Sequence, residues 1–274
     1  MTAPSWRWLT VTAAMVAAML FPVYWVVAAS FTPESRLLAA PPLVPQTLVL
    51  DHYRALFDAR DFWTPVRNSL VVAGLTTIFS VVLGAGCAYA LARLQFPGKS
   101  PILALVLAVS MFPQISIVSP LYLLLRELRL LNTYPGLVLP YLTFAMPLTI
   151  WLLVGFFRQL PAQLEEAAFM DGASRLRTLW SVVIPLAAPG LATTAILTFL
   201  YSWNEFLFAL SFALGPERYT VPVAIALLSG GSTFEIPWGA IMAASVIVTV
   251  PLVVLVLIFQ RKIVSGLTAG GVKG

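Results

Sequence analysis

Six long apolar runs constrain the fold of this chain more than any other feature of its sequence. They cover residues 8–30, 69–92, 101–125, 137–157, 190–213 and 238–260. A helix needs roughly 20 apolar residues to cross a bilayer, whereas a membrane-barrel strand shows about ten residues of alternating hydrophobicity. The runs therefore predict an all-α membrane protein with six transmembrane helices, in a single transmembrane domain over residues 1–274.

The composition supports a membrane location and excludes other classes of protein. Hydrophobic residues make up 60% of the chain and charged residues only 10%, against about 25% charged residues in a soluble domain. The net charge of +5 is spread over separated loops, so no basic face is available for nucleic acid. One cysteine, Cys87, and one histidine, His52, allow neither an intrachain disulfide nor a usual zinc site. We expect no metal and no cofactor in this chain.

The first run has two interpretations. Arg7 precedes it, and small residues between Val27 and Ser30 could form a signal-peptide cleavage site. However, the run is longer than the roughly 7–15 apolar residues of a signal core, and it contains Pro22. Both features favour a retained membrane helix.

The distribution of cations indicates the orientation. Six spans place both termini on the same side of the membrane. If that side is the cytoplasm, nine of the sixteen Lys and Arg residues lie inside and seven lie outside, in agreement with the positive-inside rule. We therefore expect both termini in the cytoplasm.

The loop between the fourth and fifth runs, residues 159–189, has the most informative pattern. Pro161 suits the first position of a short helix, where its missing N–H costs nothing. Gly172 can end that helix in the left-handed conformation, and Ser174 can cap a second helix. The pattern predicts two short helices beside the membrane, joined at Asp171-Gly172.

The second of these helices is predicted to be amphipathic. Apolar residues at i, i+3, i+4 and i+7 would form one face: Leu176, Leu179, Trp180 and Val183. Pro185 and Pro189 would end the helix before the next span. On this pattern alone, a hairpin that lies passively on the lipid headgroups is an alternative to a functional site.

The same loop resembles the EAA motif of ATP-binding-cassette (ABC) importer permeases. The matching residues are a glutamate, two alanines, a turn glycine and a proline: Glu166, Ala167, Ala168, Gly172 and Pro185. In that family the loop is cytoplasmic, and its coupling helices dock into a cleft on the ATPase subunit. The resemblance implies the type I ABC importer (MetI-like) permease fold with a cytoplasmic coupling-helix loop. It assigns ATPase coupling to Glu165, Glu166, Ala167, Ala168, Asp171, Gly172, Ala173 and Pro185.

Three further segments resemble the carbohydrate (MalG-like) branch of the family: Arg93–Lys99, Trp203–Phe206 and the tail Gly266–Gly274. One departure is a shorter second exterior loop, Arg126–Gly136. The resemblance implies half of the translocation pathway for a sugar, and we expect a di- or oligosaccharide such as maltose or trehalose. It also implies three partners in a bacterial cytoplasmic membrane: a second, different (MalF-like) permease chain, an ATPase dimer and an external sugar-binding protein.

ATP hydrolysis is expected in a partner chain and not in this one. Pro97-Gly98-Lys99-Ser100 resembles the end of a phosphate-binding loop, but Arg93 occupies the position of the first glycine that such a loop requires. ATP and Mg²⁺ are therefore expected on the ATPase, and we expect this chain not to be an enzyme.

Polar residues inside the apolar runs are candidates for the substrate pathway. Glu205 is the only acidic residue in a predicted span, and it lies beside Trp203 and Asn204. An ionisable group at that depth is costly and often functional. Gln114 follows Pro113 in the third run. The alternative for Glu205 is an interhelical polar contact that stabilises the structure.

The loop between the fifth and sixth runs contains Ser229, Gly230, Gly231 and Ser232. It resembles in position the family's loop that enters the cleft of the binding protein, although a plain solvated loop has the same composition. Two rival functions have little support. An ion-coupled secondary carrier acting without an ATPase would need several buried charges, and an intramembrane enzyme would need a catalytic pair within the spans.

Overall fold

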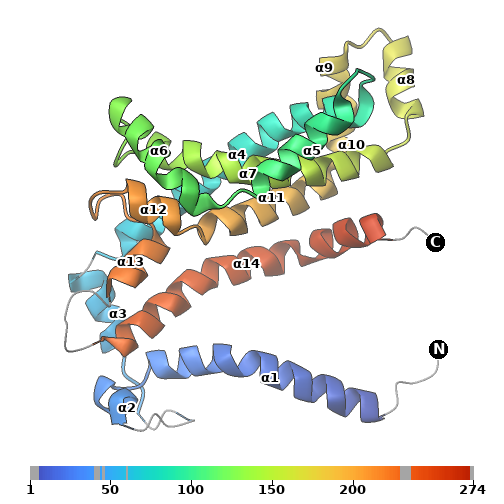
Figure 1. The fold of residues 1–274 in the computed structure, drawn as a ribbon. Coiled ribbons are helices and arrows are strands. Elements are labelled where there is room, and N and C mark those ends of the chain that lie inside the picture. Colours follow the sequence, from blue (N-terminus) through green and yellow to red (C-terminus); the bar gives the residue numbers. More distant parts are fainter. Residues whose placement is uncertain (1–5, 40–43, 45–46, 60, 229–235, 272–274) are drawn as a thin grey trace. The chain divides into compact units, whose positions relative to one another are not determined.

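A computed structural model describes residues 6–39, 44, 47–59, 61–228 and 236–271, and every regular element in these ranges is a helix (Figure 1). The prediction of an all-helical protein is confirmed. The elements are α1 (Trp6–Ser30), α2 (Glu34–Ala39), α3 (Asp51–Arg54), η1 (Ala55–Ala59), α4 (Trp63–Arg93), α5 (Lys99–Ser110), α6 (Gln114–Glu127), α7 (Tyr134–Gln159), α8 (Gln163–Met170), α9 (Arg175–Thr178), η2 (Leu179–Val183), α10 (Ile184–Leu186), α11 (Ala188–Trp203), α12 (Leu207–Phe212), α13 (Val221–Leu228) and α14 (Trp238–Gly271).

Four of the described helices are long and apolar enough to cross a membrane: α1, α4, α7 and the part of α14 from Trp238 to Gln260. Two further pairs of helices pass the same test together but are bent. Helices α5 and α6 meet at 90°, and the helical segment Arg175–Leu186 meets α11 at 82°. If each bent pair is one span, the described residues contain up to six spans.

Two of the predicted spans are not continuous helices. The run 101–125 breaks at residues 111–113, where Pro113 lacks an N–H and disfavours helix in the residue before it. The run 190–213 breaks at residues 204–206, so α11 has only 16 residues, about 24 Å of helix. Each of these two apolar runs is therefore formed by two helices that meet at a break.

The chain divides into two compact units, residues 1–63 with 224–251, and residues 64–223 with 252–274. In the first unit, the Glu34 carboxylate accepts hydrogen bonds from the backbone N–H groups of Trp238 and Gly239, at 2.8 and 3.0 Å. It thereby satisfies two N–H groups at the start of α14 that have no partner within the helix. Gly239 packs so closely against the His52 ring that no Cβ would fit. These contacts join α2 and α3 to the first turn of α14.

In the second unit, α7 packs against both α5 and α11. Glycines allow neighbouring helices to approach α7 closely. A Cβ on Gly190 of α11 would overlap the Phe156 ring, and one on Gly84 of α4 would lie 2.9 Å from the Thr149 methyl group. The Thr149 and Thr198 hydroxyls are 2.9 Å apart and link α7 to α11. Small residues and buried hydroxyls of this kind are the usual contacts between helices in a membrane.

Two buried apolar clusters form the core of the second unit. One includes Leu137, Tyr141, Phe208, Phe212 and Val223. The other includes Ala85, Ala88, Leu153, Phe157, Leu179 and Val183. The second cluster contains residues of α4, α7 and η2, so it connects the 159–189 loop to two of the long helices.

The two ends of the second unit carry different polar structures. Helices α8 and α9 project from one end (Figure 1). In the turn between α6 and α7, the Asn132 side-chain oxygen accepts hydrogen bonds from the backbone N–H groups of Leu214 and Gly215. The Asn132 amide nitrogen donates a hydrogen bond to the Glu217 carboxylate. The hydrogen bond from Asn132 lowers the pKa of Glu217 below its ordinary value. Asn132 thus ties the α6–α7 turn to the segment after α12.

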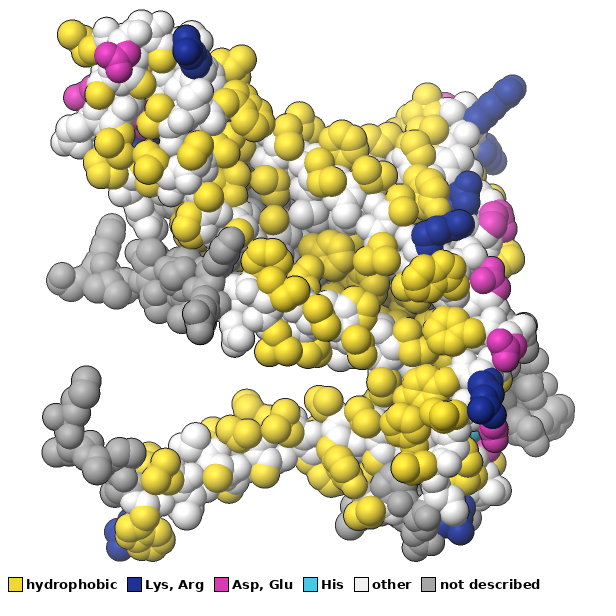
Figure 2. Space-filling view, turned by 180° about the vertical axis from the view of Figure 1, so that it is seen from behind, with side chains coloured by type: hydrophobic (Ala, Val, Ile, Leu, Met, Phe, Trp, Pro, Cys, Tyr) yellow, Lys and Arg dark blue, Asp and Glu magenta, His cyan; other side chains and the backbone are white. Residues whose placement is uncertain are grey.

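The surface agrees with a membrane environment. On the face shown in Figure 2, hydrophobic side chains cover the sides of the helices, and charged side chains gather toward the helix ends. Long apolar side chains are widely exposed, for example Met19 at 74% and Ile258 at 68%. A soluble protein rarely exposes so large a contiguous apolar surface, so lipid or other membrane helices cover these residues.

Candidate functional site

The 159–189 loop forms two short helical segments that meet at a sharp corner, as the sequence predicts. Gly172 has φ +80°, a conformation that side chains with a Cβ rarely adopt. The Ser174 hydroxyl accepts the backbone N–H of Arg177 at 3.3 Å and caps α9. Helix α8 begins at Gln163, two residues after the predicted Pro161 start.

The second helical segment ends at Leu186, between Pro185 and Pro189, as expected. Pro185 itself lies in the last turn of the segment Arg175–Leu186, two residues after the end of the π-helical turn η2. A proline in a regular helix interrupts an i→i−4 backbone hydrogen bond. In the π-helical turn before Pro185 the backbone hydrogen bonds are of the i→i−5 type instead. Pro189 lies in the first turn of α11, where proline is well tolerated. The chain turns by 82° at Ala187 and is helical on both sides of the turn.

The predicted apolar face of this helix is split. Leu179 and Val183 are buried, at 3% and 1% exposure, whereas Leu176 and Trp180 are 66% and 49% exposed. The π-helical turn alters the helical register across these positions. One pair therefore packs into the core, and the other pair lies on the surface.

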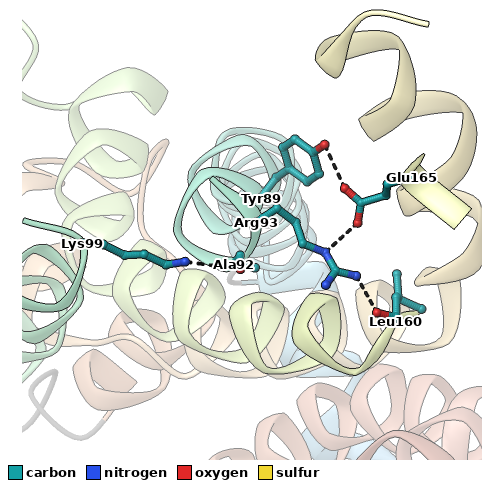
Figure 3. A network of polar contacts seen from close by, with 6 residues as sticks. All are labelled: Tyr89, Ala92, Arg93, Lys99, Leu160 and Glu165. Atoms are coloured by element: carbon teal, nitrogen blue, oxygen red, sulfur yellow. Dashed lines mark hydrogen bonds and ion pairs between the residues drawn. The ribbon is translucent and has the colours of Figure 1, made fainter. Parts of the chain in front are cut away.

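A polar network joins the loop to the ends of two long helices (Figure 3). Glu165 forms an ion pair with Arg93, with 2.5 Å between Glu165 Oε1 and Arg93 Nε. The Tyr89 hydroxyl donates to Glu165 Oε2 at 3.0 Å. Arg93 Nη2 donates to the Leu160 carbonyl at 2.6 Å. We call these four residues the Arg93 junction.

Lys99 completes the end of α4. Its Nζ donates to the carbonyls of Ala92 and Leu94, at 3.4 and 3.2 Å (Figure 3 shows the contact to Ala92). The last carbonyls of a helix have no partner within the helix, and a nearby cation satisfies them. Gly98, at φ +87°, allows the tight turn that brings Lys99 back to α4.

The two adjacent glutamates of α8 have opposite environments. Glu165 is buried at 7% exposure, and Glu166 is exposed. Among the other residues assigned to coupling, Ala167, Asp171, Gly172 and Pro185 are exposed, and Ala168 and Ala173 are half-buried. Exposed apolar side chains lie on the same loop: Leu164, Phe169, Met170, Leu176 and Trp180. Outside the Arg93 junction, the loop therefore presents exposed apolar side chains together with two carboxylates, those of Glu166 and Asp171.

A cavity of about 360 Å³ lies between the end of α4 and the loop. It is lined by Tyr89, Arg93, Leu94, Gln95, Ala162, Glu165, Glu166, Phe169 and Arg175. Three of the four residues of the Arg93 junction and the exposed Glu166 therefore line the same cavity.

The candidate pathway residues around Glu205 differ in environment. The Glu205 carboxylate accepts the backbone N–H groups of Phe208 at 2.8 Å and Ala209 at 3.2 Å, so it caps α12 where the fifth run breaks. Trp203 is only 1% exposed. Asn204 is exposed, and its amide donates to the Leu200 carbonyl. The contacts of Glu205 agree with a structural polar contact, and only Asn204 faces outward.

Gln114 lies at the other helix break. Its amide donates to the Tyr201 hydroxyl, which brings the α5–α6 bend close to α11. Tyr201 is half-buried, and its role could not be predicted, because an isolated tyrosine in an apolar run carries no local signal. The candidate binding-protein contacts Ser229, Gly230, Gly231 and Ser232 lie outside the described residues.

Sequence reasoning also missed the partners of Glu165. In the sequence, Arg93 belongs to a family-like segment and rules out a phosphate-binding loop, whereas nothing distinguishes Tyr89. The only available signal was that Arg93 lies in the last turn of a span, four residues after Tyr89 and on the same helix face.

We expect Glu205→Ala to destabilise the protein, because the N–H groups of Phe208 and Ala209 would lose their partner inside an apolar environment. Loss of a helix cap costs about 1–2 kcal/mol. The measurement is the melting temperature in detergent, with Asn204→Ala as the control at an exposed neighbour. Equal melting temperatures for the two variants would contradict the capping role.

Comparison with known proteins identifies the family. Residues 80–268 match the model of the family described as "Binding-protein-dependent transport system inner membrane component". The matched region contains residues 80–93 of α4, the whole 159–189 loop and the helix breaks at residues 111–113 and 204–206.

Two similar proteins extend over nearly the whole chain. The trehalose transport system permease protein SugB of Mycobacterium tuberculosis is 46% identical over 97% of this chain and 97% of its own length. The trehalose/maltose transport system permease protein MalG of Thermococcus litoralis is 44% identical over 95% of this chain and 94% of its own length.

The fold is shared with a solved transporter. A chain from the crystal structure of a bacterial ABC transporter involved in the import of alginate superposes with a TM-score of 0.79, at 22% identity, over 95% of this chain and 98% of that chain. The predicted ABC importer permease fold is thereby confirmed. With its apolar helices and the match over residues 80–268, this chain belongs to the family of binding-protein-dependent transport system inner membrane components, and it is a multi-pass membrane protein.

Proposed function

We propose that this chain is the permease subunit of an ATP-driven importer of a disaccharide, with trehalose as its substrate. The two similar permeases named above both belong to systems that transport trehalose, by their names. Identity of 46% and 44% over almost the full chain supports a related substrate. Nothing in the family match supports a secondary carrier that works without an ATPase.

The observation that carries the coupling role is the contrast between Glu165 and Glu166. Glu165 is committed to an ion pair within the chain, whereas Glu166 is exposed next to the small side chain of Ala167. A fixed helix that presents a carboxylate and small or apolar side chains suits a groove with a basic group on a partner. The proposed partner is the ATPase dimer, which binds ATP and Mg²⁺ and docks on the 159–189 loop.

This assignment gives the orientation and the remaining partners. The loop would lie in the cytoplasm, together with the ends of α4 and α7 that it contacts, and both termini would be cytoplasmic. The long helix α1 buries only Ala28, Ala29 and Ser30 among its described residues. Its apolar sides are available to lipid and to a second permease chain. A sugar-binding protein would deliver the substrate from the other side.

The helix breaks are the proposed sites of the sugar pathway. Gln114 and Tyr201 meet where α5 and α6 bend, and Asn204 is exposed at the end of α11. Hydroxyl and amide groups of these kinds hydrogen-bond sugars. Trp203 and Glu205 are excluded from direct contact in this proposal, since one is buried and the other caps α12.

The ATPase interaction is tested by co-purification from detergent-solubilised membranes. We expect an ATPase subunit to purify with the wild type and to be lost from a Glu166→Lys, Gly172→Val double variant, because both changes fall on the exposed corner of the loop. Glu127→Lys, at an exposed site outside the loop, is the control and should retain the ATPase. Absence of any ATPase from the wild-type preparation would refute the proposal.

Substrate and energy source are tested together in proteoliposomes containing the complete complex. Uptake of labelled trehalose should require ATP on the ATPase side and the binding protein on the other, and an ionophore that collapses ion gradients should leave it unchanged. Trehalose uptake without ATP, driven by an imposed proton or sodium gradient, would favour the carrier. ATP-dependent uptake of maltose with no uptake of trehalose would correct the substrate alone.

A further inference from the structure

Helix α8 is anchored to the rest of the protein in an unusual way. It has eight residues, fewer than the roughly 12–15 that an isolated helix needs to be stable in water. Its position must therefore be fixed by contacts outside the helix. Glu165 is the only residue of α8 that is buried, so a charged side chain, and not an apolar one, supplies the buried contact.

The next part of the loop is held differently. Leu179 and Val183 are buried in the apolar cluster shared with α4 and α7. The loop thus has two separate attachments, a polar one at α8 and an apolar one at η2. Only the polar one lies on the helix that carries Glu166 and Ala167.

Three helix ends converge on the Arg93 guanidinium. Arg93 is the last residue of α4, Leu160 directly follows α7, and Glu165 belongs to α8. The planar guanidinium binds the Glu165 carboxylate and the Leu160 carbonyl at the same time, which a lysine at this position could not do with the same geometry. The side chains of Arg93 and Glu165 are only 16% and 9% exposed, so water screens the ion pair weakly.

We propose that Arg93 and Glu165 are positioning residues for energy coupling, because their ion pair makes α8 and the adjacent ends of α4 and α7 move as one body. This inference rests on the proposed docking of an ATPase on the loop. A force applied to the exposed face of α8 passes through the ion pair to α4. Without the ion pair, α8 moves independently of α4, and ATP is hydrolysed without a matching movement of the spans.

The first test measures rigidity in the isolated chain and needs neither ATPase nor sugar. Spin labels are placed at Ser100→Cys and Met170→Cys, both exposed positions, in a Cys87→Ser background. We expect a narrow distance distribution in the otherwise unchanged chain. Glu165→Gln, which keeps the side-chain shape, should broaden it by about twofold or more, because α8 loses its buried charge contact. Arg158→Glu, an exposed charge change at the end of α7, should not. An equally narrow distribution in Glu165→Gln overturns the proposal.

The second test measures coupling in proteoliposomes as ATP hydrolysed per labelled trehalose transported. Arg93→Glu and Glu165→Arg should each raise this ratio by about threefold or more, within the range in which such networks modulate coupling. The Arg93→Glu, Glu165→Arg exchange should recover at least half of the loss, since the opposite charges face each other again. An uncoupled exchange variant, or a single variant with the wild-type ratio, would overturn the positioning role.

The outcomes separate this inference from the proposed function. If no ATPase binds the wild type, the proposed function fails, and the spin-label distances still decide whether the ion pair holds α8 in place. If the ATPase binds and Glu165→Gln changes neither distance nor ratio, the proposed function stands and the positioning role fails. If the single charge variants do not assemble, Glu165→Gln and the exchange variant decide.

Discussion

A bilayer offers no hydrogen-bonding partner to the backbone, so each helix break in this chain must be satisfied by the protein itself. The structure does this with charged side chains. Glu205 caps α12, Glu34 caps the start of α14, and Lys99 covers the last carbonyls of α4. Each of these contacts satisfies backbone groups at a helix end that have no partner within the helix.

The same principle explains why the two glutamates of the 159–189 loop have different roles. The buried Glu165 attaches the loop to the rest of the protein, and the exposed Glu166 is free to contact a partner. Burying Glu165 is costly unless its charge is paired and its oxygens are hydrogen-bonded. Arg93 pairs the charge of Glu165, and Tyr89 donates a hydrogen bond to one of its two oxygens. Attachment through a paired charge fixes the direction of α8 more narrowly than apolar packing does, because ion pairs and hydrogen bonds have preferred geometries.

The sequence predicts those features that depend on neighbouring residues. The corner at Gly172 and the cap at Ser174 follow from local backbone preferences, and the apolar runs locate the long helices. Long-range features were not predictable. Tyr89 and Glu165 are 76 residues apart, so nothing local links them. The break at Asn204 has no proline to mark it, unlike the break at Pro113, and the π-helical turn η2 split an apolar face that was predicted for a regular helix.

The central claim is that the exposed face of α8 contacts an ATPase. The most direct measurement is photo-crosslinking in intact membranes with p-benzoylphenylalanine at Ala167, an exposed position on that face. The account predicts a crosslinked product containing the ATPase subunit. The same probe at Leu139, an exposed apolar position on α7, should give no such product. An ATPase product from Leu139 and none from Ala167 would contradict the account.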